Sequence, residues 1–123
     1  MNNEKTFLND ENFGKLNITT VVEFYNYPRL FFAENSETNQ KYIVVETNEI
    51  NENKSEFLLA PISENVYRDV YTYSEIDFKT AFLRAENKTT FLITIENAVC
   101  KEIKTISCSD LTDDLLPESG ERY

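Results

Sequence analysis

Short runs of β-branched, leucine and aromatic residues recur along the chain, separated by polar turns rich in Asn. Apolar runs of this length, bounded by turn residues, favour β-strands. Because the connecting turns are short, each strand is expected to pair antiparallel with the strand before it, as in a meander. The predicted strands are residues 17–25, 29–34, 41–47, 56–60, 88–96 and 99–108.

Two short helices are expected between the fourth and fifth predicted strands. Ser63 follows a proline-containing break and is a suitable N-cap for a helix at residues 64–71. Phe78 and Phe82 lie four residues apart, so they would share one face of a second helix at residues 78–83. The predicted fold class is therefore α+β, an antiparallel meander of about five or six strands with one or two short helices packed on one face.

The length of 123 residues is that of one domain. Residues 1–15 are polar and are expected to form an N-terminal arm, followed by a single α+β domain at residues 16–108. Residues 109–123 combine acidic side chains with leucines, and we expect an acidic C-terminal tail. The chain begins with a polar segment that lacks a signal-peptide pattern, and no apolar run approaches the ~20 residues that span a bilayer. A cytoplasmic location is expected.

The residues that most enzyme sites need are scarce in this chain. There is no His, so a Ser/His or Cys/His pair would lack its base. Gly14 and Gly120 stand alone, whereas a loop that cradles phosphate needs several glycines. We therefore expect no catalytic residue and no cofactor.

The 22 acidic residues outnumber the 12 basic residues, which gives a formal net charge of −10. Nucleic acids and membrane headgroups are anionic, so a direct contact with either is disfavoured. Basic surfaces of other proteins are favoured as partners, because an acidic surface attracts them. Solubility alone is the alternative explanation of the charge.

Two features that resemble metal or redox sites have simpler explanations. Cys100 and Cys108 are expected to be free, buried thiols of a cytosolic protein, with a disulfide as the alternative. The segment 46–56 offers four possible oxygen ligands for Ca²⁺ or Mg²⁺, which are Glu46, Glu49, Glu52 and Glu56, but it lacks the glycine and the Asp-x-Asp order of a Ca²⁺ loop. We expect a solvated hairpin tip and no metal site.

Aromatic residues are the first candidates for a partner-binding surface. Two short helices cannot cover both faces of a sheet, so one face is expected to expose aromatic side chains. The predicted anchors are Tyr25, Tyr27, Tyr67 and Tyr71, and ordinary core packing of these residues is the alternative. Edge strands also allow pairing with a second copy, so a homodimer stays open.

The acidic tail is the second candidate. Asp113 and Asp114 are followed by Leu115 and Leu116, and such a segment can dock into an apolar groove with a basic rim. A frayed terminus is the alternative.

Four sequence blocks together resemble a family of small bacterial domains of unknown function. The blocks are Tyr-Pro-Arg-Leu-Phe-Phe at 27–32, Gln-Lys-Tyr-Ile-Val-Val at 40–45, Phe-Leu-Leu-Ala-Pro-Ile-Ser-Glu at 57–64 and Ile-Asp-Phe-Lys-Thr-Ala-Phe at 76–82. The resemblance covers about residues 17–86, and Phe57 stands where family members commonly have Trp. It implies a small α+β domain of bacterial or phage origin, and it carries over no catalytic residue.

These observations favour a non-enzymatic protein–protein interaction module, acting as an accessory or regulatory subunit of a bacterial or phage system such as anti-phage defence. The alternative is a small acidic inhibitor, for example an immunity, antitoxin or anti-defence protein, that occludes a cationic site of an enzyme. A contiguous acidic face would support the inhibitor. An enzyme or metal-binding domain would instead need a cleft with convergent carboxylates.

Overall fold

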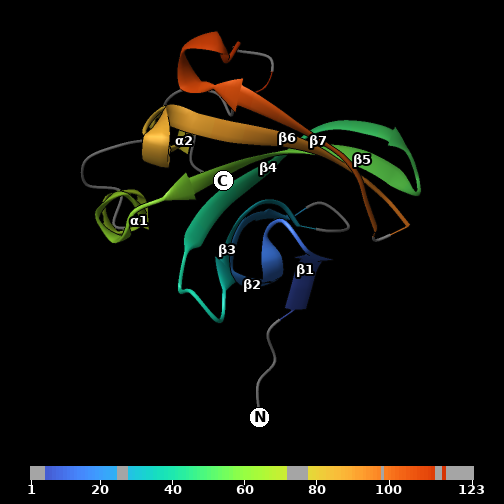
Figure 1. The fold of residues 1–123 in the computed structure, drawn as a ribbon, viewed down its shortest axis with the longest axis horizontal. Coiled ribbons are helices and arrows are strands. Elements are labelled where there is room, and N and C mark those ends of the chain that lie inside the picture. The colour runs from blue at the N-terminus through green and yellow to red at the C-terminus, as the bar shows by residue number, and fades with distance from the viewer. Residues whose placement is uncertain (1–4, 25–27, 72–77, 98, 113–114, 116–123) are drawn as a thin grey trace.

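Seven strands form one antiparallel sheet in which each strand pairs with the next one in sequence (Figure 1). A computed structural model describes residues 5–24, 28–71, 78–97, 99–112 and 115. The sheet curls into a half-barrel. Its strands are β1 (Lys5–Asp10), β2 (Gly14–Phe24), β3 (Pro28–Asn35), β4 (Lys41–Asn51), β5 (Lys54–Ile62), β6 (Thr89–Glu96) and β7 (Val99–Ser107). The helices are α1 (Glu64–Tyr71) and α2 (Phe78–Leu83), and the 3₁₀ turns are η1 (Glu86–Lys88) and η2 (Cys108–Asp110).

The predicted fold class is wrong in its strand count and in the role of its helices. The sheet has seven strands, not five or six, because residues 5–10 of the expected N-terminal arm form β1 and pair with β2. The molecule is mostly antiparallel sheet, and its helices, of eight and six residues, are too small to be a layer that covers a face. The bounds predicted for both helices are confirmed.

The central strands are buried on both faces. Successive side chains of a strand point to opposite faces, and in β5 four successive residues from Phe57 to Ala60 are all buried. An outer cluster lies on the face toward the helices, and an inner cluster lies within the curve of the sheet. The outer cluster is Leu30, Phe32, Ile43, Leu58, Ala60, Ile62, Val66, Val70, Phe78, Ala81, Phe82 and Ala85. The inner cluster is Leu8, Phe13, Leu16, Phe31, Ala33, Tyr42, Val44, Phe57, Leu59 and Ile93.

The N-terminal strands close the inner face. The Phe7 ring of β1 packs edge-on against Phe31 of β3 at 4.9 Å and against Phe57 of β5 at 5.2 Å, measured between ring centroids. Phe13, in the β1–β2 turn, packs in the same way against Tyr42 of β4 at 6.1 Å. The expectation that one face of the sheet stays exposed is therefore wrong, because the sheet covers its inner face by curling.

The side-chain amide of Asn35 links the β1–β2 turn to the β3–β4 turn. Asn35 Nδ2 donates to the carbonyl oxygen of Phe13 at 2.8 Å, and Asn35 Oδ1 accepts from the backbone N–H of Glu37 at 2.8 Å. Gly14 begins β2 with a φ of +73°, and a Cβ at this position would lie 2.5 Å from Asn35 Nδ2. Glycine is required here, because both its backbone conformation and the amide exclude a side chain.

Polar contacts attach α1 to the sheet. Lys41 Nζ of β4 lies 3.0 Å from a carboxylate oxygen of Glu34 and 3.5 Å from one of Glu64 in the first turn of α1. The Tyr67 ring packs edge-on against Phe32 at 4.9 Å, and Lys41 Nζ lies 5.2 Å from the centre of the Tyr67 ring. Ion pairs and aromatic packing thus hold the helix on β3 and β4.

The predicted N-cap of α1 is confirmed, because Ser63 Oγ accepts from the backbone N–H of Val66 at 3.2 Å. Phe78 and Phe82 of α2 are both buried, as their spacing predicts. No helix in the described part of the chain is long and apolar enough to cross a bilayer.

The described part of the C-terminal segment packs on the outer cluster. Cys108, Leu111 and Leu115 are partly buried against it. Cys108 Sγ lies 3.5 Å from the carbonyl oxygen of Phe82. Both cysteines are free thiols, as expected, but both are only partly buried, so the expectation of buried thiols is wrong.

Candidate functional site

The β4–β5 hairpin and the β6–β7 turn lie side by side at one end of the sheet, on the right in Figure 1. Lys54 of β5 pairs with Glu96 of β6, and the backbone N–H of Asn97 donates to the carbonyl oxygen of Asn53 at 2.9 Å. We call residues 48–55, 95–97 and 99–100 the hairpin end. Hydrogen bonding between its two turns makes it one surface.

The hairpin itself is longer than the sequence predicts. The predicted strands end at residue 47 and begin again at residue 56, but β4 continues to Asn51 and β5 begins at Lys54, which leaves only Glu52 and Asn53 in the turn. The Asn51 side-chain oxygen accepts from the backbone N–H of Asn53 at 2.8 Å, a local bond that favours a tight turn. Asn and Glu have low strand propensity, but pairing with β5 overrides it.

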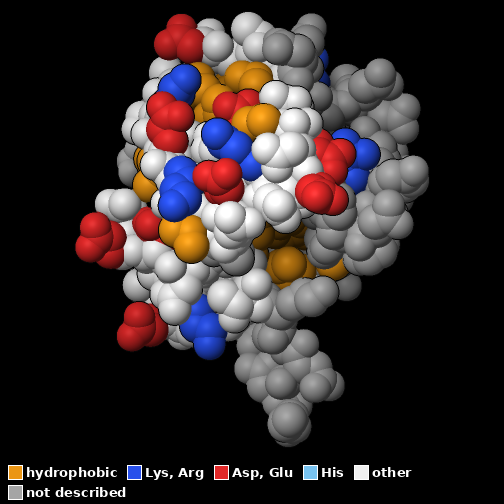
Figure 2. All heavy atoms as spheres, turned by 90° about the vertical axis from the view of Figure 1, so that its right-hand side faces the viewer, with side chains coloured by type: hydrophobic (Ala, Val, Ile, Leu, Met, Phe, Trp, Pro, Cys, Tyr) orange, Lys and Arg blue, Asp and Glu red, His pale blue; other side chains and the backbone are white. Residues whose placement is uncertain are grey.

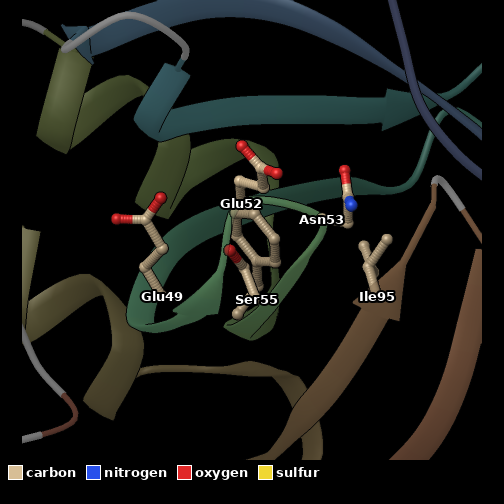
Figure 3. A pocket seen from close by; sticks show the side chains of 6 residues that line it. Glu49, Glu52, Asn53, Ser55 and Ile95 are labelled. Carbon is tan, nitrogen blue, oxygen red and sulfur yellow. The ribbon is translucent and has the colours of Figure 1, made fainter.

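A pocket of about 180 Å³ opens at the hairpin end (Figure 3). Strand register creates it, because Glu49 pairs with Ser55, which pairs with Ile95, and paired residues project to the same face of a sheet. The floor is apolar, since Phe57 and Ile95 also pack in or against the inner cluster. The full lining is Glu49, Glu52, Asn53, Ser55, Phe57 and Ile95.

The pocket has a negative rim. Glu49 and Glu52 are both exposed, and no Lys or Arg is among the six lining residues. Glu46, nearer the middle of β4, has a different role. Its side chain is fully buried and pairs with Arg29 Nε at 3.0 Å, so this carboxylate belongs to the packing of the sheet.

Large apolar side chains reach the surface at the same end of the molecule. Ile50 is 45% exposed and Val99 is 53% exposed. Figure 2 looks onto this end and shows apolar side chains between acidic and basic ones, with a hollow in the surface. The hairpin end therefore combines exposed apolar side chains, two solvent-exposed carboxylates and a pocket.

A second pocket, of about 260 Å³, lies between the β1–β2 turn and β7. Its lining is mainly polar and includes Asp10, Glu102 and the Cys100 thiol. Burial raises the pKa of Cys100, and the negative charge of Asp10 raises it further, so the nucleophilic thiolate is disfavoured. Among the described residues, no three His, Cys, Asp or Glu side chains are grouped to hold a metal ion.

Two of the predicted binding residues can be placed, and both contact the core. Tyr67 and Leu115 are partly buried against the outer cluster, and the Tyr67 ring helps to attach α1. Tyr71 ends α1, but its side chain lies outside the described residues. The remaining predicted residues, Tyr25, Tyr27, Asp113, Asp114 and Leu116, also lie outside them.

Sequence reasoning missed the pocket, although it identified Glu49 and Glu52 as part of a hairpin tip. The apolar floor was not associated with them, because Ile95 is more than forty positions away in the chain. The Asn51-Glu52-Asn53 sequence was the available signal. A tight turn there would have extended both strands and brought Glu49 opposite Ser55.

Comparison with known proteins gives a family but no function. The model of a family of unknown function, DUF6575, matches residues 4–122, which is nearly the whole chain. No curated protein and no solved structure matches the chain. The bacterial or phage origin implied by the sequence blocks stays a prediction.

Proposed function

This chain belongs to the DUF6575 family of unknown function, so the family assigns it no role. We propose a role from the side chains that are exposed on its surface. It is a non-enzymatic protein–protein interaction module, an accessory or regulatory subunit that contacts its partner through the hairpin end. The bacterial or phage system suggested by the resemblance is the proposed setting.

The observation that carries this proposal is the position of the exposed apolar residues. The fold buries apolar side chains on both faces of its central strands, so exposed ones are few. Four large apolar residues of the described chain are exposed: Val21, Ile50, Leu83 and Val99. Two of these four, Ile50 and Val99, belong to the hairpin end, although neither lines the pocket. Large apolar side chains that are exposed together at one end of a molecule are typical of a contact surface.

The charge of the chain supports a basic partner. A formal net charge of −10 attracts cationic surfaces, and Glu49 and Glu52 extend that field to the hairpin end. Charges at the rim of an interface mainly increase the association rate, and salt screens them. The association is therefore expected to weaken as salt is raised.

The acidic-inhibitor alternative has no comparable support. A mimic of nucleic-acid charge needs a contiguous acidic face, whereas on the face that Figure 2 shows, which includes the hairpin end, acidic side chains are interspersed with Lys and Arg. Only the interaction module is therefore proposed.

Two double variants test the surface. A tagged chain is used to capture its partner from the source cells at low and high salt, read by mass spectrometry. Ile50→Ser/Val99→Ser should abolish capture of the partner that the unmodified chain binds. Val21→Ser/Leu83→Ser removes as many exposed apolar residues elsewhere and should leave capture intact. If both double variants lose capture of the partner equally, or if neither loses it, the hairpin end has no role in binding.

A further inference from the structure

The size of the hairpin-end pocket restricts its occupant. Sites for drug-sized ligands have volumes of about 300–1,000 Å³. This pocket has about 180 Å³, which lies below that range. A single side chain is of the right scale, and a cofactor is too large.

The lining determines the chemistry of that side chain. Phe57 and Ile95 provide an apolar lining, and Glu49 and Glu52 add negative charge. Figure 3 labels Glu49, Glu52 and Ile95 around the pocket. The complement is a long side chain with an apolar stem and a cationic head. Arginine fits better than lysine, because its planar guanidinium can pair with a carboxylate through two hydrogen bonds and can stack on an aromatic ring.

We propose that the hairpin-end pocket binds an arginine side chain of the partner protein. The stem of the arginine lies against Phe57 and Ile95, and its guanidinium pairs with Glu49 and Glu52. This inference rests on the proposed function and identifies the chemistry of the partner at that same surface.

Two cations of the described part of the chain, Arg29 and Lys54, do not fill the pocket. Arg29 is held by the buried Glu46 carboxylate at 3.0 Å. Lys54 precedes Ser55 in β5, and neighbouring residues of a strand point to opposite faces, so Lys54 projects away from the pocket side of the sheet. The two rim carboxylates are thus left to pair with a cation supplied from outside.

An NMR titration tests the proposal without knowledge of the partner. The probe is the peptide acetyl-Gly-Arg-Gly-amide, added to the full chain up to high millimolar concentration while amide signals are recorded. We expect saturable shifts at Glu49, Glu52, Ser55 and Ile95. The citrulline peptide has nearly the same shape without the charge and should shift these signals far less. Equal shifts with both peptides, or none with arginine, would overturn the proposal.

Variants with the same change of charge locate the binding. Glu49→Gln/Glu52→Gln should lower the affinity for the arginine peptide about tenfold, because two exposed ion pairs would be lost. Glu11→Gln/Glu37→Gln removes two exposed carboxylates elsewhere and should leave the affinity unchanged. Ser55→Leu should block binding by filling the pocket. If the control pair weakens binding as much as the pocket pair, the site is wrongly assigned.

Failure of this inference differs from failure of the proposed function. If Ile50→Ser/Val99→Ser abolishes partner capture but Glu49→Gln/Glu52→Gln does not, the hairpin end binds the partner without an arginine in the pocket. If neither double variant affects capture, the proposed function fails as well.

Discussion

The two ends of β4 and β5 differ in how they are covered. Toward the helices, β4 buries Tyr42, Ile43 and Val44 in succession, because Ile43 packs in the outer cluster and Tyr42 and Val44 pack in the inner cluster. Toward the hairpin, the same strand is exposed from Asn48 to Asn51. One strand can therefore stabilise the domain at one end and present side chains to a partner at the other.

Charges at the two ends are used differently. Near the helices, Lys41 lies between Glu34 and Glu64, so an ion-pair group joins β3, β4 and α1. At the hairpin end, Glu49 and Glu52 face solvent beside an apolar floor. Charges near the helices contribute to stability, whereas those of the hairpin end can be changed at little cost to the fold.

The largest expected effect is a core truncation at the helix end. Phe82 is fully buried, so Phe82→Ala should lower the free energy of unfolding by about 3–5 kcal/mol. Ile50→Ala at the hairpin end should change it by at most about 0.5 kcal/mol, because this side chain is 45% exposed. Urea unfolding followed by circular dichroism measures both. Similar losses would mean that the two ends do not differ in stability.

The turn that closes the inner face should be the next most sensitive. Gly14→Ala should cost about 1–3 kcal/mol, because the new Cβ meets Asn35 Nδ2 and the positive φ disfavours alanine. The neighbouring exposed Lys15 provides the control, and Lys15→Ala should lie within about 0.5 kcal/mol of the unmodified chain. Urea midpoints compare the two variants. A harmless Gly14→Ala would show that this turn tolerates a side chain.

A smaller effect is expected from the ion-pair group. Lys41→Met keeps the apolar stem but removes the charge that Glu34 and Glu64 share, and it should cost about 1 kcal/mol. Lys54→Met, at the hairpin end, should be close to neutral. Thermal and urea unfolding measure both variants, and a larger loss for Lys54→Met would reverse the comparison.

The smallest effect concerns alkaline pH. Burial lowers the pKa of Lys41, but its pairing with Glu34 and Glu64 outweighs burial and leaves the pKa raised. Burial, with a contribution from Glu86, raises the pKa of Tyr42. The unfolded chain, with ordinary pKa values of about 10.4 for Lys and about 10 for Tyr, therefore loses these protons first.

The raised pKa values of Lys41 and Tyr42 contribute to the free energy of unfolding. This contribution is complete below about pH 10 and is lost as the pH rises through the raised pKa values of the folded chain. Urea midpoints measured across this range should fall as the pH rises, and Lys41→Met should reduce the fall. A midpoint that rises with pH in this range would contradict the assignment.

Much of the fold could be predicted because its signals are local. Helical spacing and Ser63 predicted both helices with their observed bounds, and apolar runs located six of the seven strands. β1 was missed because only Phe7 and Leu8 interrupt its polar sequence. It becomes a strand by pairing with β2 and by packing Phe7 on β3 and β5, which are contacts distant in sequence.

The amino-acid sequence by itself determined the consecutive order of the elements, the two helices and the acidic charge, since each depends on neighbouring residues or on composition. Only the tertiary structure decided that the sheet curls over its inner face, that Glu46 is buried with Arg29, and that Glu49 stands at the rim of a pocket. The physical reason is strand register. Which carboxylate is buried and which faces solvent depends on partners across the sheet, and local periodicity does not specify them.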